Sequence, residues 1–166
     1  MLAEFEKQKQ QRTIIEQESR AAMIFSLALL GSIVVYGVIA FLQRTPLRFT
    51  KAVNNAYDIL NIVAIVLVIV VLAIRKTVYF SPRLIDQDST LTALLRRWRT
   101  IDIILLSFAE IIALFGLVIT LLGMPFARTF HFFVAAFLLT MILMPINWKV
   151  RDKIRNFEKY SGKQVL

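Results

Sequence analysis

The sequence contains no cysteine and a single histidine among its 166 residues. Without thiolates the chain cannot form a disulfide, ligate an iron–sulfur cluster or attach haem covalently, and one histidine cannot supply both axial ligands of a haem. We therefore expect no metal site and no cofactor within the chain, although a bound lipid or quinone remains open. A redox role would require a cofactor held by a partner.

Charged residues are nearly absent from four long apolar blocks. The sequence is 58% hydrophobic and 19% charged, and the blocks cover residues 21–42, 57–75, 101–123 and 126–146. Each has about the 20 residues that a helix needs to cross a bilayer, and an isolated strand could not satisfy its backbone in lipid. The sequence thus predicts an all-α, polytopic membrane protein: one membrane domain, residues 1–166, with four transmembrane helices.

The first twenty residues are mostly polar and rich in the helix formers Glu, Gln and Lys. No Pro or Gly occurs before Gly31, so one helix is expected from near Glu4 to about Leu42, with residues 1–20 as a cytoplasmic extension. The block 21–42 is expected to stay as an anchor, because no cleavage pattern follows it. The arm has only a sparse apolar stripe. It is either a solvated, salt-bridged arm or a docking helix for a partner.

The segment 89–99 predicts a short amphipathic helix in the headgroup region. Asp88 and Ser89 offer an N-cap, and apolar residues then recur at helical spacing up to Trp98. Three arginines lie alongside: Arg96, Arg97 and Arg99. This segment is either a simple membrane-surface anchor or a specific lipid or protein site. The tail, 147–166, alternates basic and apolar positions and is expected to continue as a surface helix.

Lys and Arg are distributed unevenly between the loops. Sixteen lie in the arm, the 75–100 loop and the tail, against four in the other two connections. The positive-inside rule therefore places both termini in the cytoplasm, and Trp98 and Trp148 fall at the cytoplasmic boundary, where aromatic rings settle. The net charge of +9 is interpreted as topology and contact with anionic lipid, not as binding to nucleic acid.

Glu110 lies inside the third apolar block, about 14 Å along a helix from its start. An acidic side chain near the centre of a membrane helix costs roughly 2.5 to 3.5 kcal/mol, so the carboxyl is expected to be protonated at rest. The small residues Ala109, Ala113 and Gly116 lie on or near its face and favour a helix–helix contact. The expected neighbours are Ser107 on the same helix, Thr140 at a similar depth on the fourth helix, and Tyr36, Ser32 and Gly37 on the first.

A second polar set lies nearer the outer face: Asp58, Asn61, Arg128 and His131. Asp58 could pair with Arg128 or with His131 at that depth. The alternative is that these side chains simply extend to the membrane surface.

Residues 108–119, Phe-Ala-Glu-Ile-Ile-Ala-Leu-Phe-Gly-Leu-Val-Ile, resemble the carboxylate-bearing helix of rotary ATP synthase c subunits. The resemblance implies that Glu110 matches the ion-binding carboxylate and Gly116 belongs to the Gly-Leu-Val tail. It covers about a dozen residues, and the glycine-rich partner helix of c subunits is absent. The chain as a whole resembles small four-span proteins of the bacterial inner membrane that share this segment, which implies the same location.

These residues bear on three classes of function. The first is a non-catalytic membrane subunit of a larger complex, with Glu110 as a contact between helices or to a partner. The second is a proton- or ion-translocating protein, most naturally an oligomer, with Glu110 as the carrier. The third, a membrane enzyme, has no nucleophile–base pair, metal triad or phosphate loop in its favour. The sequence therefore predicts that the chain is not an enzyme, and that it associates with other membrane subunits or with itself.

Overall fold

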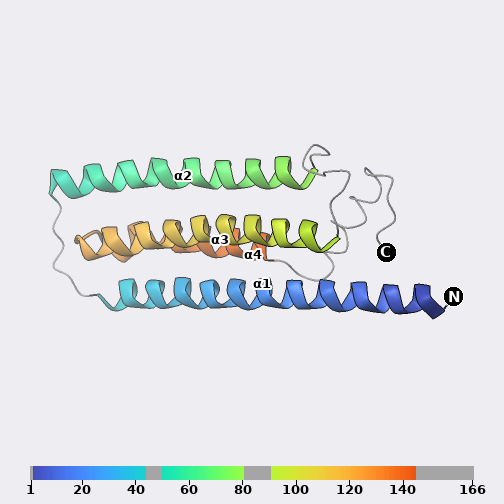
Figure 1. Ribbon diagram of the computed structural model, residues 1–166. Helices are drawn as coiled ribbons and strands as arrows, with labels where there is room; N and C mark the ends of the chain where they lie inside the picture. The colour runs from blue at the N-terminus through green and yellow to red at the C-terminus, as the bar shows by residue number, and fades with distance from the viewer. Residues whose placement is uncertain (1, 44–49, 81–90, 145–166) are drawn as a thin grey trace.

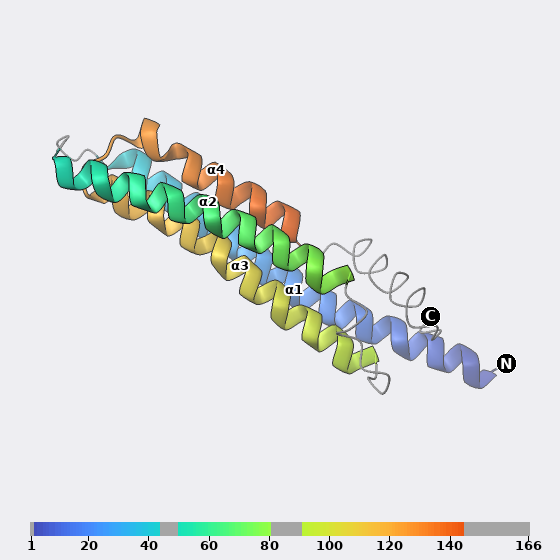
Figure 2. The ribbon, with the colours of Figure 1, turned by 90° about the horizontal axis from the view of Figure 1, so that it is seen from above.

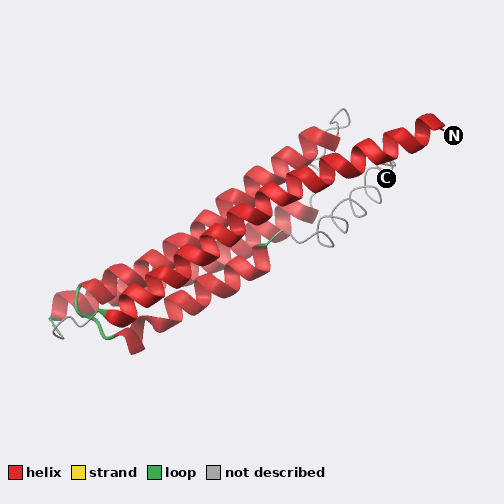
Figure 3. Ribbon diagram, turned by 90° about the horizontal axis from the view of Figure 1, so that it is seen from below, coloured by secondary structure: helices red, strands yellow, loops and turns green. Residues whose placement is uncertain are grey.

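The computed structural model describes residues 2–43, 50–80 and 91–144, and within these ranges the chain is helical with no strand (Figure 3). The four helices are α1 (Leu2–Leu42), α2 (Lys51–Phe80), α3 (Leu91–Leu121) and α4 (Phe126–Leu143). Each contains a stretch long and apolar enough to cross a membrane: Arg20–Leu42, Lys51–Thr77, Leu95–Leu121 and Phe126–Leu143. The fold is therefore that of a multi-pass membrane protein.

Several boundaries differ from those predicted from the sequence, most of all the starts of α2 and α3. Helix α2 begins at Lys51, six residues before the apolar block, because polar residues extend it and the Val53 N–H donates to the Thr50 hydroxyl (3.3 Å), which caps its first turn. A separate interfacial helix was expected at 89–99. Helix α3 is instead continuous from Leu91, so this segment, from Leu91 on, is the first part of α3. The expected tail 147–166, with Trp148, lies outside the described residues.

Helix α3 is the centre of the bundle. It packs against each of the other three helices, while α1 and α2 lie on its two sides and α4 lies behind it (Figures 1 and 2). Helices α1 and α3 run in one direction and α2 and α4 in the other. In keeping with this arrangement, 44% of the residues in an apolar 18-residue stretch of the α3 span are buried inside the chain, against 11% in the α2 span. The core is lined by residues such as Leu105, Ala109 and Ile112 of α3.

Most of the surface of α2 is apolar and is not covered by the other helices that the structure describes. Ala64 and Val71, one heptad apart, are its buried residues, whereas Ile59, Ile62 and Ile69 are at least 60% exposed. In water so much exposed aliphatic surface would be strongly unfavourable, but lipid tails are as apolar as these side chains. The pattern therefore fits a helix that faces lipid or another membrane segment.

The hairpin of α3 and α4 is the closest contact in the fold. Gly123 takes a positive φ of 103° at the turn, which other residues rarely adopt. Near the turn, the hydroxyls of Thr120 and Thr129 lie 2.7 Å apart and both residues are buried. Farther along, Gly116 lets the backbone of α3 approach Phe132 and Phe133 of α4. A turn, a hydroxyl pair and a glycine contact together hold the two helices in register.

Replacing Gly116 with Ala should weaken this hairpin. The added Cβ would lie 2.9 Å from Cβ of Phe132, so the helices must separate, and overpacking of this kind costs about 1–3 kcal/mol. Gly31→Ala is the matched control, because a Cβ there meets nothing within 4 Å and Ala favours the helix by about 0.5–1 kcal/mol. Unfolding in mixed SDS micelles, followed by circular dichroism, gives the two free energies of unfolding. Equal effects at both glycines would contradict the close approach.

The two threonines should stabilise the hairpin as a pair. Each hydroxyl also lies against a backbone carbonyl of its own helix, Gly116 at 2.8 Å and Phe126 at 3.2 Å, so one can donate to the other while that one donates to its backbone. We expect Thr120→Val and Thr129→Val to be coupled by about 0.6 kcal/mol, with roughly 1.7 as the upper end for such bonds in a membrane. A double-mutant cycle measures the coupling, and strict additivity would rule out the pair.

Candidate functional site: the Glu110 carboxyl between α1 and α3

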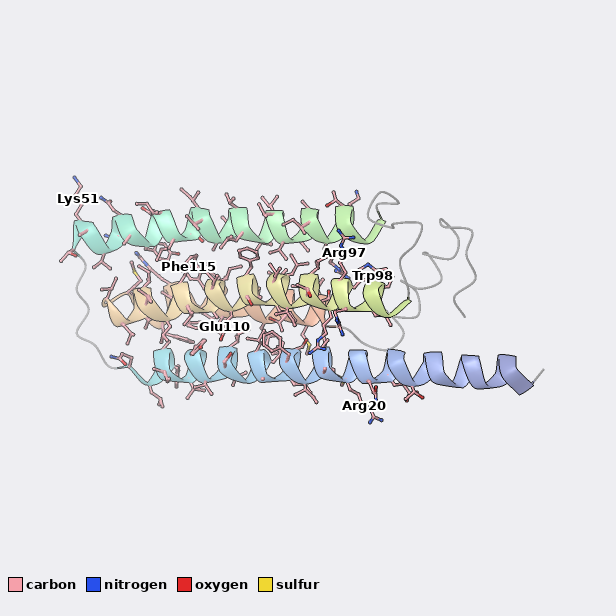
Figure 4. All side chains as sticks on the ribbon, viewed as in Figure 1. Arg20, Lys51, Arg97, Trp98, Glu110 and Phe115 are labelled. Carbon is pink, nitrogen blue, oxygen red and sulfur yellow. The ribbon has the colours of Figure 1, made fainter. Side chains whose placement is uncertain are left out.

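Glu110 lies on the side of α3 that faces α1 (Figure 4). Its position follows from the helical period. Ala109 and Ala113, on one side of it, are fully buried, whereas Ile111 and Leu114, on the other, are exposed. Glu110 itself is half-buried, at the border between the packed face of α3 and its uncovered face. A carboxyl at that border can contact both a neighbouring helix and whatever surrounds the bundle.

Two hydroxyls of α1 contact the carboxyl. The Tyr36 hydroxyl donates to Oε1 of Glu110 across 3.1 Å, and the Ser32 hydroxyl lies 3.2 Å from the same oxygen. Ser32 and Tyr36 are four residues apart and therefore share one face of α1, which packs against α3. The carboxyl thus joins two helices through residues that are 74 and 78 positions apart in the chain.

The hydroxyl and acid protons around Oε1 of Glu110 can be arranged in two ways. The Ser32 hydroxyl has one proton and two acceptors within reach, the Leu29 carbonyl at 2.9 Å and Oε1 of Glu110 at 3.2 Å. Oε1 can accept from both hydroxyls as the carbonyl oxygen of a protonated acid, which places the acid proton on Oε2. Alternatively Oε1 carries the proton and donates to Ser32, while Ser32 donates to Leu29. Both arrangements satisfy Oε1 when the carboxyl carries one proton.

The expected neighbours of Glu110 fall into two groups. Tyr36 and Ser32 contact it. Thr140 is buried in α4, and its hydroxyl donates to the Ala136 carbonyl of its own helix at 2.8 Å. The Ser107 hydroxyl likewise donates within α3, to the Ile103 carbonyl at 3.0 Å. The prediction for Thr140 rested on its depth in the membrane, and depth does not determine the direction in which the Thr140 hydroxyl points.

A second carboxyl, Asp102, is more buried than Glu110 and was not predicted from the sequence. It is 4% exposed, near the start of the α3 span. Asp102 follows the buried Trp98 by four residues and precedes the buried Ala109 by seven, so all three share one face. That spacing was the signal that could have identified it. Among the described residues, no group of three or more Asp, Glu or His side chains could hold a metal.

The outer polar set is only partly assembled. His131 Nε2 lies 3.1 Å from the Asn61 side-chain oxygen, and this contact joins α4 to α2. Tyr57, one turn before Asn61, donates to the Arg128 backbone carbonyl at 3.3 Å, and its ring meets the His131 ring edge-on. Asp58 is exposed and makes no hydrogen bond or ion pair within the described residues. Asp58 therefore forms neither of the two expected pairs.

The predicted interfacial residues lie at the start of α3, at the opposite end of the bundle from Lys51 (Figure 4). Arg96 and Arg97 are exposed and Arg99 is half-buried. Trp98 is only 9% exposed and belongs to the buried face of the helix together with Leu95. Most of its ring surface is therefore covered by the chain itself and is not free to contact headgroups.

No protein-family model, no curated protein and no solved structure matches this chain. None of these comparisons supports the resemblance of residues 108–119 to c subunits, so the geometry of the Glu110 site is the guide to function.

Removing the Tyr36 hydroxyl should weaken the α1–α3 contact only while Glu110 is present. We expect Tyr36→Phe to lower the free energy of unfolding by about 0.6 kcal/mol, with roughly 1.7 as the upper end, because that is the range for interhelical hydrogen bonds in membranes. In a Glu110→Leu background the same change should have almost no effect. Unfolding in mixed micelles provides the comparison. An equal loss in both backgrounds would mean that the hydroxyl acts through another group.

Proposed function

We propose that this chain is a non-catalytic integral membrane subunit or accessory protein of a larger complex in a bacterial inner membrane. The observation that supports it best is the Glu110 carboxyl, which joins α1 to α3 through one oxygen and leaves the other without a partner among the described residues. The uncovered apolar surface of α2 is also suited to contact with a neighbouring membrane segment.

In this proposal both termini lie in the cytoplasm. The direction of the helices places Arg20, Arg75 and the arginines at the start of α3 at one end of the bundle, and Lys51 and Arg128 at the other. The end with more basic residues is the cytoplasmic one under the positive-inside rule. The arm 1–20 and the basic start of α3 would then be the parts that reach cytoplasmic partners or anionic headgroups.

The alternative function is translocation of a proton or ion with Glu110 as the carrier. One observation favours it: Tyr36, Glu110, Ser32 and the Leu29 carbonyl form a continuous line of oxygen atoms in which a proton could shift. Translocation also needs polar groups that connect this line to both faces of the membrane. Within the described residues, the line ends at the Leu29 carbonyl on one side and at the Tyr36 hydroxyl on the other.

Glu110→Gln and Glu110→Leu distinguish the two functions. Gln keeps an oxygen that accepts from Ser32 and Tyr36 but cannot carry a proton, whereas Leu removes both properties. If the chain is a subunit, Gln should support copurification with its partners from native membranes in mild detergent, and Leu should reduce it several-fold. If the chain is a carrier, Gln should abolish proton flux in proteoliposomes. A chain that purifies alone under these conditions would overturn the subunit proposal.

A further inference from the structure

One oxygen of Glu110 is left without a partner. Both hydrogen bonds of the carboxyl end on Oε1, and Oε2 receives none from the described residues. Among the described residues that are buried or half-buried, every buried side-chain nitrogen or oxygen has a hydrogen-bond partner. Glu110 is half-buried and its Oε2 has no partner among the described residues, so Oε2 itself is not buried. It opens on the surface of the chain.

The surroundings of Oε2 are apolar. On α3 the exposed neighbours of Glu110 are Ile111 and Leu114, and on α1 the exposed residues beside Ser32 and Tyr36 include Ala28 and Val35. Glu110 lies 15 residues from the start of the α3 span and 11 from its end, about 22 Å and 17 Å along the helix. A polar atom at that depth is costly unless another group satisfies it.

Lipid tails offer no hydrogen-bonding group, so another polypeptide at the same depth is the simplest source of a partner for Oε2. Exposed residues of the described spans at that depth are apolar. The half-buried hydroxyls of Ser32, Tyr36 and Ser107 already donate within the chain. In a second copy of this chain, the group best able to form a hydrogen bond with the Glu110 carboxyl is therefore Glu110 itself. A neutral carboxylic acid is self-complementary, because it has both a donor and an acceptor.

We propose that two copies of this chain associate through their α1–α3 faces, with the two Glu110 carboxyls hydrogen-bonded to each other across a two-fold axis. A two-fold axis places the same patch on both partners, so each acid satisfies the other. Ala28, four residues before Ser32, and Ser107, three residues before Glu110, have small side chains, which allow helices to approach closely. In this contact the Oε2–H of each acid donates to Oε1 of the other; Oε1 keeps the bond from Tyr36, and the Ser32 hydroxyl donates to the Leu29 carbonyl. It does not depend on which larger complex the chain joins.

The absence of cysteine makes a direct test simple, since any cysteine introduced is the only one in the chain. Ser107→Cys places a thiol one turn from Glu110, and the Ser107 hydroxyl bonds only its own helix, so no interhelical bond is lost. Ile69→Cys, on the exposed side of α2, is the matched control. The full chain is purified, reconstituted in vesicles and oxidised, and disulfide-linked dimers are measured over time. Ser107→Cys should cross-link much faster than Ile69→Cys.

The dependence on Glu110 is then measured in the Ser107→Cys background. Glu110→Gln should retain cross-linking, because a carboxamide is also self-complementary, whereas Glu110→Leu should weaken association about tenfold, the loss expected from one or two interhelical hydrogen bonds. Because Leu could also disturb α1–α3 packing, Ala28→Trp provides a second variant. Ala28 is exposed, so a bulky residue there should block the dimer without altering the monomer, whereas Ala73→Trp on α2 should not.

Several outcomes would overturn the proposal: equal cross-linking at the two cysteine positions, dimers that persist in Glu110→Leu and Ala28→Trp, or a Ser107→Cys product in native membranes that contains a different polypeptide. The last outcome would favour a partner subunit at the same site. Because the vesicles contain only this chain, failure of the dimer is distinguishable from failure to copurify with a larger complex.

Discussion

Glu110 places a carboxyl inside a membrane span with no basic side chain at its depth among the described residues, and the need to satisfy that carboxyl connects the helices of the bundle. No Lys or Arg of the described spans lies near the depth of Glu110, and water is absent from the hydrocarbon region, so the carboxyl needs neutral donors and acceptors. Ser32 and Tyr36 supply two hydroxyls from one face of α1. This contact ties α1 to the central helix, while close packing against Phe132 and Phe133 ties α4 to it. Helix α3 is therefore held on both sides, by a polar contact and by an apolar one.

The same carboxyl connects the internal architecture with external association. One oxygen contacts two hydroxyls within the chain, and the other opens on an apolar surface. In water an open carboxyl oxygen is simply hydrated and indicates nothing, but in lipid it marks a place where another group belongs. The proposed function and the proposed dimer both start from this oxygen. They differ in the identity of the neighbour, a second copy or a different subunit.

The fold was largely predictable because its signal is strong and local. Four apolar blocks predicted four helices, and the described part of the chain has four helices long and apolar enough to span a membrane. Boundaries were less predictable, since hydropathy marks the lipid-facing part of a helix and not its end. Thus α2 extends to Lys51 through polar residues, and the arginine-rich segment before residue 101 continues α3 instead of forming a helix of its own. Charge and amphipathicity identify a surface segment but do not fix the angle at which it meets the next helix.

Length and hydropathy were enough to identify a helical membrane protein with Glu110 as its unusual residue, because span length and the cost of a buried acid are properties of single segments. The hydroxyls that meet the carboxyl could not be chosen in that way. Tyr36, Ser32 and Thr140 were all acceptable by depth, yet Thr140 bonds its own backbone and the first two meet Glu110. Depth can be counted along one helix. The direction in which a side chain points around the helix axis, relative to the neighbouring helices, depends on how three helices pack together. In this chain that packing is set by contacts between different helices, such as Gly116 against Phe132.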